Sequence, residues 1–321
     1  MVIEYILFFL GIFLLIKSAG WIIEGSVSLA KKLKVSALII GLTVVAFGTS
    51  LPELIVNLFA AFNGSSEIIF GNIVGSNIAN IFLVLGTIAI ISNVTVKTTT
   101  VWKQIPFALL AAIVLFFMTS GAFFGIGDDL FTFSDGLILL SLFAIFIYDI
   151  FKISVKERHG ISHFKKDSIP EKNLHIFIKL FLGLIGIYLG GKWVVSGAVL
   201  IASQLGFSEF LISATIIALG TSLPELVVSV VAALKKNVDL AVGNIVGSNI
   251  FNIFWVLGIV PLVGPLKIPP FIVFDIAVMF FATLLLFIFM FTGRHHEIRR
   301  KEGIVFILLY VLYITFIIIR G

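Results

Sequence analysis

The chain has 321 residues, of which 60% are hydrophobic and 12% are charged, and its formal net charge is +5. Soluble globular domains carry roughly 25% charged residues, so this composition excludes most soluble enzymes and indicates a protein embedded in a membrane. The absence of cysteine excludes disulfides, thiolate metal sites and cysteine nucleophiles.

Apolar segments separated by polar residues follow one another along the whole chain. Because a membrane-spanning helix needs about 20 predominantly apolar residues, the chain can hold about ten such helices. The first segment resembles a signal peptide, but it contains Glu4 and Lys17 and has no cleavage site of small residues, so we interpret it as a retained helix. We expect helices near residues 2–29, 35–62, 67–92, 104–122, 131–151, 174–204, 209–233, 238–260, 270–292 and 303–319.

The basic residues outside and at the ends of these helices gather on one face of the predicted bundle. Only Lys267 and Arg320 fall on the other face. Loops rich in lysine and arginine stay in the cytoplasm, so we expect a multi-pass protein of the cell membrane with both termini outside and the basic loop 152–173 inside. That loop is interpreted as a topological anchor; the alternative is a regulatory or lipid-headgroup site.

Two sequence motifs occur twice, at a constant offset of 172 residues (218 − 46 and 243 − 71). AFGTSLPELIVN at 46–57 recurs as ALGTSLPELVVS at 218–229, and GNIVGSNIANIF at 71–82 recurs as GNIVGSNIFNIF at 243–254. Each copy contains five predicted spans, and an odd number makes the second copy enter the membrane from the opposite face. Repeats of this kind place a binding site near the bilayer midplane, between the halves.

The sequence therefore predicts an all-α membrane protein with ten transmembrane helices in two inverted-topology five-helix repeats. The first repeat is 1–151, the cytoplasmic basic loop is 152–173, and the second repeat is 174–321. An alternative interpretation is that the repeated Gly, Ser and Asn residues only allow close helix packing. That alternative does not explain the glutamates in the motifs.

One glutamate lies in the middle of an apolar span in each half, Glu53 and Glu225. An ionised carboxylate at the bilayer centre costs roughly 2.5 to 3.5 kcal/mol on insertion scales. The lysines within spans, Lys17, Lys179 and Lys192, lie outside the motif helices and supply no evident counter-charge. We therefore expect a bound cation at the two carboxylates; the alternative is a buried, protonated structural pair.

The residues around each glutamate are suited to binding a cation. Pro52 and Pro224 cannot donate a backbone hydrogen bond, so each helix should break there and free carbonyls near 46–49 and 218–221. Hydroxyls and amides three or four residues apart share a helix face; these are Ser50, Ser222, Ser76, Asn80, Ser248 and Asn252. We expect Asn72, Asn77, Asn244 and Asn249 to bond between helices rather than to the ion.

All of these candidate ligands are oxygens. Hard cations such as Ca²⁺ and Na⁺ prefer oxygen, whereas zinc, copper and iron normally recruit nitrogen or sulfur. Two carboxylates balance one divalent ion or a small group of monovalent ions. Since the empty, doubly charged site would be costly to carry across the membrane, such a site favours exchange of one ion for the other.

The paired GTSLPE and GNIVGSN motifs, repeated in both halves, resemble the cation/calcium antiporter superfamily, and most of all its prokaryotic sodium/calcium exchangers. The resemblance covers essentially the whole chain. It implies a core of the second, third, seventh and eighth helices, with the first and sixth sliding past it. Potassium-dependent branches of the superfamily favour Asp at the position of Asn252, so the resemblance also implies that transport does not depend on potassium.

The resemblance also implies roles for individual residues. Its central calcium site falls on Glu53 and Glu225 with the carbonyls of Thr49 and Thr221. Its flanking sodium sites fall on Ala46, Ser50 and Ser76 and on Ala218, Ser222 and Ser248, and Asn80 and Asn252 complete the ring.

We accordingly expect a secondary active antiporter that exchanges Na⁺ for Ca²⁺ by alternating access, with calcium export as its direction. We expect no cofactor beyond the transported ions, no nucleic acid and no obligatory protein partner. The alternatives are an H⁺-coupled Ca²⁺ antiporter of the same fold and a cation channel that uses the same carboxylates. An enzyme is not expected, because the spans contain no nucleophile and base pair and no HExxH-like motif.

Overall fold

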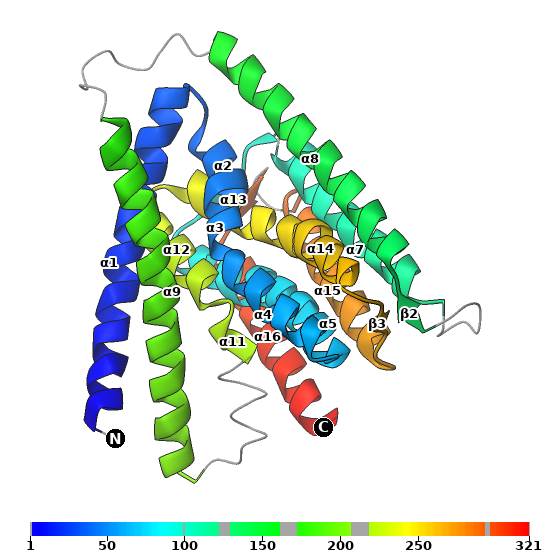
Figure 1. Cartoon of the computed structure of the whole chain (residues 1–321). Helices are drawn as coiled ribbons and strands as arrows, with labels where there is room; N and C mark the ends of the chain where they lie inside the picture. Colours follow the sequence, from blue (N-terminus) through cyan, green and yellow to red (C-terminus); the bar gives the residue numbers. More distant parts are fainter. Residues whose placement is uncertain are drawn as a thin grey trace.

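The chain forms a bundle of long apolar helices (Figure 1). This computed structural model describes residues 2–98, 100–121, 129–160, 172–206, 218–292 and 296–320. Within these residues nine helical segments are long and apolar enough to cross a membrane, and α12 is a shorter apolar helix. The predicted seventh span, 209–233, begins outside the described residues and is followed from residue 218 onward. The expected all-helical membrane fold is confirmed.

The helices of the two halves follow the same order. The first half contains α1 (Val2–Leu33), α2 (Ala37–Ile40), a π-helical stretch (Gly41–Val45), α3 (Ala46–Thr49), α4 (Leu51–Phe62), α5 (Ser66–Ala79), a second π-helical stretch (Asn80–Leu85), α6 (Gly86–Ile91), a third (Thr100–Gln104), α7 (Ile105–Thr119) and α8 (Phe133–Gly160). The second half contains α9 (Asn173–Gln204), α11 (Ala218–Gly220), α12 (Leu223–Leu234), α13 (Val238–Ile250), a π-helical stretch (Phe251–Val256), α14 (Leu257–Ile259), a 3₁₀ turn (Val260–Leu262), α15 (Ile272–Phe289) and α16 (Arg300–Arg320).

Two short antiparallel strand pairs join the loops. β1 (Val94–Thr95) pairs with β4 (Glu297–Ile298), and β2 (Leu130–Phe131) pairs with β3 (Leu266–Lys267). The offset of 172 makes β1 and β3 equivalent, because Val94 corresponds to Leu266. Each pair joins a loop of one half to a loop of the other. The other two strands are not equivalent, because Leu130 corresponds to Glu302 and not to a residue of β4.

The expected loop 152–173 is too long. Helix α8 continues to Gly160, and residues 161–171 lie outside the described part of the chain. Lysine, glutamate and arginine are good helix formers, so the polar run after the apolar span continues the helix. Glu157 on this extension accepts a hydrogen bond from the backbone N–H of Ser36 at 2.7 Å, which ties the end of α8 to the start of α2.

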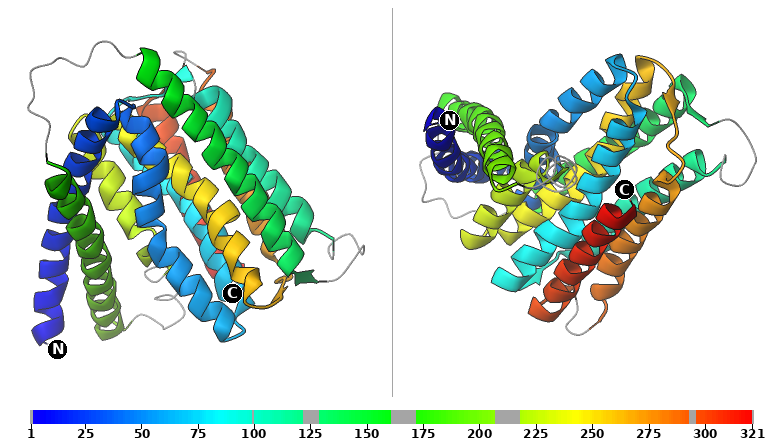
Figure 2. Two further views of the ribbon diagram at one scale, coloured as in Figure 1. Left: turned by 45° about the horizontal axis from the view of Figure 1, so that its top comes forward. Right: turned by 90° about the horizontal axis from the view of Figure 1, so that it is seen from below.

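Helices α1 and α9 form an antiparallel pair at one edge of the bundle (Figure 2). Glycines bring their backbones together: a Cβ on Gly190 would lie 2.9 Å from the Gly11 carbonyl oxygen, and one on Gly25 would lie 3.0 Å from Leu180. Tyr5 bonds Gln204 near one end of the pair, and Lys32 bonds Asn173 at the other. Since α1 and α9 are equivalent in the repeat and run in opposite directions, the two halves are inverted.

The remaining helices enclose the most buried spans, α5 with its continuation and α13 with its continuation. The second and eighth spans cross closely, because a Cβ on Gly243 would lie 2.6 Å from the Leu38 carbonyl oxygen and one on Gly41 would lie 2.6 Å from that of Leu240. Only glycine permits this approach. The crossing places the break in the second span against α13 of the other half.

Candidate ion-binding site

The second and seventh spans break at equivalent residues. Helix α3 ends before Ser50 (φ −86°, ψ 2°), and α12 begins after Ser222 (φ −86°, ψ 0°). Pro52 and Pro224 lack the N–H that would continue the hydrogen-bond ladder, which explains both breaks. The Ala46 carbonyl, which we expected to be free, accepts the Ser50 N–H at 3.0 Å and lies 3.4 Å from the Thr49 hydroxyl, which donates to it.

Each break places one glutamate in the first turn of the helix that follows it. Glu53 is 0% exposed and Glu225 is 1% exposed. Both oxygens of Glu53 and Oε2 of Glu225 are buried without a hydrogen-bond partner, whereas Oε1 of Glu225 accepts a long bond from Ser248 at 3.4 Å. Buried acceptors without partners are rare in proteins, so these carboxylates require another explanation than internal bonding.

The neighbouring polar side chains show the same imbalance. Asn80 donates to Asn249 Oδ1 at 3.0 Å, and Asn252 donates to Ser76 Oγ at 3.1 Å and to Asn77 Oδ1 at 3.2 Å. Their donors are thus used, while their Oδ1 atoms are buried without partners. The hydroxyl oxygens of Ser50 and Ser222 also lack partners. Among the predicted ligands the atoms without partners are oxygens, which is the pattern expected of cation ligands, whereas Asn72 Nδ2 is a donor without a partner.

The two asparagines lie in the π-helical stretches Asn80–Leu85 and Phe251–Val256. A π-helical turn inserts an extra residue and rotates the side chains that follow, and it occurs frequently at functional sites. Sequence periodicity gave no sign of these stretches.

Asparagines of the motifs bond between helices, as expected. Thr49 donates to Asn244 Oδ1 at 3.1 Å and lies 3.3 Å from Ser248 Oγ, while Thr221 donates to Asn72 Oδ1 at 2.9 Å. The threonine hydroxyls therefore use their hydrogens in bonds between helices. Both bonds join one half of the chain to the other.

The predicted residues come together to different degrees. Glu225 and Ser248 of the second half lie beside Thr49 and Ser50 of the first, and Asn252 meets Ser76. Ala46 begins α3, and Ala218 begins α11 as the first described residue of its span. None of the hydrogen bonds between described residues joins Ala218 or Thr221 to another predicted ligand.

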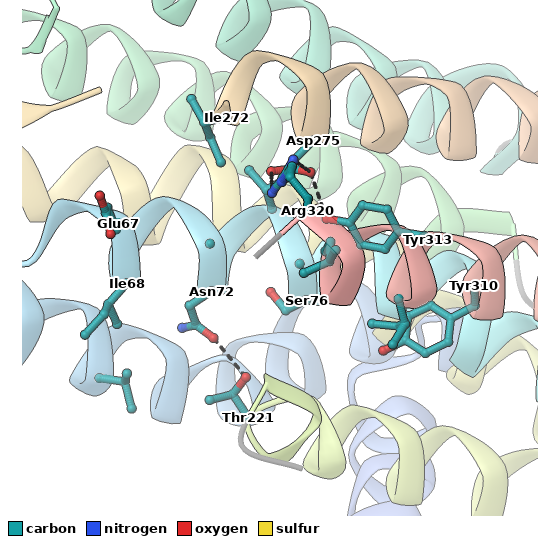
Figure 3. A pocket seen from close by; sticks show the side chains of 16 residues that line it. Glu67, Ile68, Asn72, Ser76, Thr221, Ile272, Asp275, Tyr310, Tyr313 and Arg320 are labelled. Carbon is teal, nitrogen blue, oxygen red and sulfur yellow. Dashed lines mark hydrogen bonds and ion pairs between the residues drawn. The ribbon is translucent and has the colours of Figure 1, made fainter. Parts of the chain in front are cut away.

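A cavity of about 370 Å³ extends from the site toward the face where α16 ends (Figure 3). Asn72, Ser76 and Thr221 line one part of it, and Asp275 and Arg320 line another. Of the twelve predicted ligands only Ser76 and Thr221 reach this cavity.

An ion pair on this cavity was missed by the sequence analysis. Arg320 donates to both oxygens of Asp275 at 3.0 and 2.9 Å, and the Tyr313 hydroxyl donates to Asp275 at 3.4 Å. The repeat offset carries a signal, because Asp275 corresponds to Lys103, which pairs with Asp149 at 3.0 Å. Each half thus has an ion pair from this position, with the charges exchanged, although the partners are displaced by one residue because Arg320 corresponds to Tyr148.

The chain is similar to known membrane proteins over nearly its whole length. The family described as sodium/calcium exchanger protein matches residues 3–152 and 175–319. The putative antiporter CaxA of Alkalimonas amylolytica is 35% identical over 319 residues, 98% of each chain. The sodium/calcium exchanger MaX1 of Methanosarcina acetivorans is 32% identical over 345 residues, again 98% of each chain.

A solved structure gives the same result. The sodium-calcium exchanger NCX_Mj, soaked with 2.5 mM Na⁺ and 0.1 mM Ca²⁺, is 35% identical with a TM-score of 0.80, and the match covers 98% of both chains. The ten-helix inverted repeat expected from the sequence is thus the fold of this chain, and the chain is a multi-pass membrane transporter rather than an enzyme. It belongs to the sodium/calcium exchanger protein family, within the cation/calcium antiporter superfamily.

Proposed function

We propose that this antiporter exchanges Na⁺ for Ca²⁺ at one midplane site that is exposed to each side of the membrane in turn. The observation that carries the proposal is the group of buried oxygens without hydrogen-bond partners on Glu53, Glu225, Ser50, Ser222, Asn80 and Asn252. A buried acceptor without a partner costs free energy unless something binds it. Carboxylate, hydroxyl and amide oxygens together are the ligands that Ca²⁺ and Na⁺ prefer.

Within this site, Glu53 and Glu225 with the carbonyls of Thr49 and Thr221 are the proposed calcium ligands. The proposed sodium ligands flank them: Ala46, Ser50 and Ser76 on one side, and Ala218, Ser222 and Ser248 on the other, with Asn80 and Asn252 between. One Ca²⁺ balances the two carboxylates, and so does a small number of Na⁺. Exchange follows because changing the exposure of the site from one side to the other with both carboxylates ionised and no cation bound would cost free energy.

The α1–α9 pair is the element that we infer to move. It is held to the core at one face, where Lys235 after α12 bonds Glu24 of α1 at 3.2 Å. The repeat-equivalent positions at the opposite face are Asn63 and Ser196, which form no ion pair. This ion pair at one face favours opening of the site toward the other face, on which the cavity beside Asp275 also lies.

Membrane placement completes the proposal. Both termini lie outside the cell and the basic segment 152–173 lies in the cytoplasm, which the distribution of basic residues supports. The two transporting halves are 1–151 and 174–321. The partners are the two ions and the lipid bilayer.

The test is radioactive calcium uptake into liposomes that contain the purified protein and sodium. Uptake should require an outward sodium gradient and vanish in Glu53→Gln. The matched control is Glu297→Gln, a carboxylate in β4 whose nearest cationic partner, Arg299, is 4.0 Å away. Uptake driven only by a proton gradient would refute sodium coupling, and uptake that is fast and indifferent to any opposing gradient would indicate a channel.

A further inference from the structure

We propose that Asn57 supplies a further cation-binding oxygen, one helical turn from Glu53 toward the face that carries the chain termini. This inference rests on the proposed function and extends the proposed ion-binding site toward that face alone. The cation would meet the Asn57 amide oxygen before it reaches the carboxylates. Asn57 is the last residue of the motif at 46–57, but the expected ligand set does not include it.

The position of Asn57 is fixed by the buried face of α4. The buried residues of this helix are Glu53, Asn57 and Ala60, at a spacing of four and three residues. Such a spacing forms one stripe along a helix. Asn57 therefore lies on the same inward face as the carboxylate, and it is 0% exposed.

The bonding of Asn57 matches that of the proposed ligands. Its Nδ2 donates to the Glu53 carbonyl at 2.8 Å, which fixes the orientation of the amide. Its Oδ1 is buried without a partner, as are the Oδ1 atoms of Asn80 and Asn252. In all three side chains the donor is engaged and the acceptor is bare.

The two halves of the repeat differ at this position. Ser229 is the equivalent residue, and its hydroxyl accepts from Asn244 Nδ2 at 2.9 Å. Asn244 Oδ1 in turn accepts from Thr49, so the chain of bonds in that half is complete. All three groups are thus satisfied without an ion.

The equivalent series of hydrogen bonds beside Asn57 lacks its last bond. Thr221 donates to Asn72 Oδ1 at 2.9 Å, but Asn72 Nδ2 and Asn57 Oδ1 both lack partners. The exchange of serine for asparagine thus leaves a bare oxygen on one side of the site only. The cavity lies on this side: Val56 and Asn72 line it, and Asn57 lies behind this lining. Figure 3 shows Asn72 at the cavity.

The chemistry favours a cation at this oxygen. An amide oxygen is a usual ligand of Ca²⁺ and Na⁺. The Glu53 carboxylate one turn away favours positive charge over neutral water in a region of low dielectric constant. A cation bound at Asn57 would be attracted by the Glu53 carboxylate before it is fully dehydrated.

The test measures the calcium KM separately from each face of the membrane, in liposomes where the protein has one orientation. Asn57→Leu removes the oxygen at similar volume and should raise the KM from the terminal face about three- to tenfold, the usual worth of one polar contact. The KM from the opposite face and the maximal rate should not change. Asn57→Asp should lower the KM from the terminal face.

Ser229→Ala is the matched control, because it removes a hydroxyl that is already bonded in the other half and should leave the KM from the terminal face unchanged. An unchanged KM in both Asn57 variants would overturn the proposal and indicate that the amide oxygen bonds a bridging water instead of a cation. An equal rise from both faces would also overturn it, since a structural role has no preferred side. If wild-type protein shows no sodium-driven uptake, the proposed exchange fails, and Asn57→Asp is judged by equilibrium binding of radioactive calcium in detergent.

Discussion

Replacing Glu53 by glutamine should abolish calcium binding and also stabilise the cation-free protein. Both oxygens of Glu53 are buried without a partner, so in the absence of a cation nothing offsets the cost of its charge. That cost is roughly 2.5 to 3.5 kcal/mol at the bilayer centre, and the amide avoids it at nearly the same shape. At neutral pH the cation-free variant should therefore exceed the wild type in free energy of unfolding by up to about 3 kcal/mol.

The sign of this difference depends on pH. The ionised carboxylate destabilises the folded wild type, so the advantage of the variant is present at neutral pH and is lost as pH falls and the carboxylate takes up a proton. Calcium, in contrast, should raise the free energy of unfolding of the wild type. At a calcium concentration 100 times its Kd, the wild type should gain about 2.7 kcal/mol, and the variant should gain nothing.

The assay is unfolding of the purified protein in detergent, with chelator or with calcium, at neutral and at mildly acidic pH. Glu297→Gln is again the matched control and should respond to calcium as the wild type does. Two results would refute the reasoning: calcium that stabilises Glu53→Gln as much as the wild type, or a cation-free variant that is less stable than the wild type at neutral pH.

Three further predictions concern the helix pair, its attachment and acid. A Cβ on Gly190 would lie 2.9 Å from the backbone oxygen of Gly11, so Gly190→Ala should lower the free energy of unfolding by about 1 to 3 kcal/mol. Gly191→Ala is the control and should leave it unchanged, because a Cβ there meets nothing within 4 Å. Equal melting temperatures of the two variants would contradict this prediction. Lys235→Gln removes the partly exposed ion pair with Glu24, worth at most about 1 kcal/mol, and should change the ratio of calcium KM values at the two faces by up to about fivefold; an unchanged ratio argues against a role in alternation. Calcium uptake should weaken in acid through a higher KM at constant maximal rate, because protons compete for the carboxylates, and uptake indifferent to acid would exclude this competition.

Much of the fold could be predicted because the bilayer imposes few solutions. Apolar length located the spans, and the constant offset between motifs identified the inverted halves. The end of α8 was misplaced because its last residues are polar, and hydropathy cannot distinguish a polar helix from a polar loop. Good helix formers extend it to Gly160.

The candidate site was predictable where a single residue determines local geometry. Pro52 and Pro224 located both breaks, since proline removes a backbone donor wherever it occurs in a helix. The π-helical stretches and the bare Asn57 oxygen could not be foreseen, because they depend on how helices from different halves meet. The pairing of Asp275 with Arg320 was missed because 45 residues separate the partners, and sequence spacing does not show how α15 and α16 pack.

The α1–α9 pair has a consequence for the tightness of the membrane. Each helix has 32 residues, roughly 48 Å at 1.5 Å per residue, which exceeds a hydrocarbon core of about 30 Å. Glycine contacts along the seam and polar bonds near both ends make the pair a stiff rod built from one helix of each half. A stiff rod that tilts about its middle brings one end toward the core as the other end leaves it. Under the proposed alternating access, a leak of ions needs both ends open together, and a stiff seam between α1 and α9 would prevent that state.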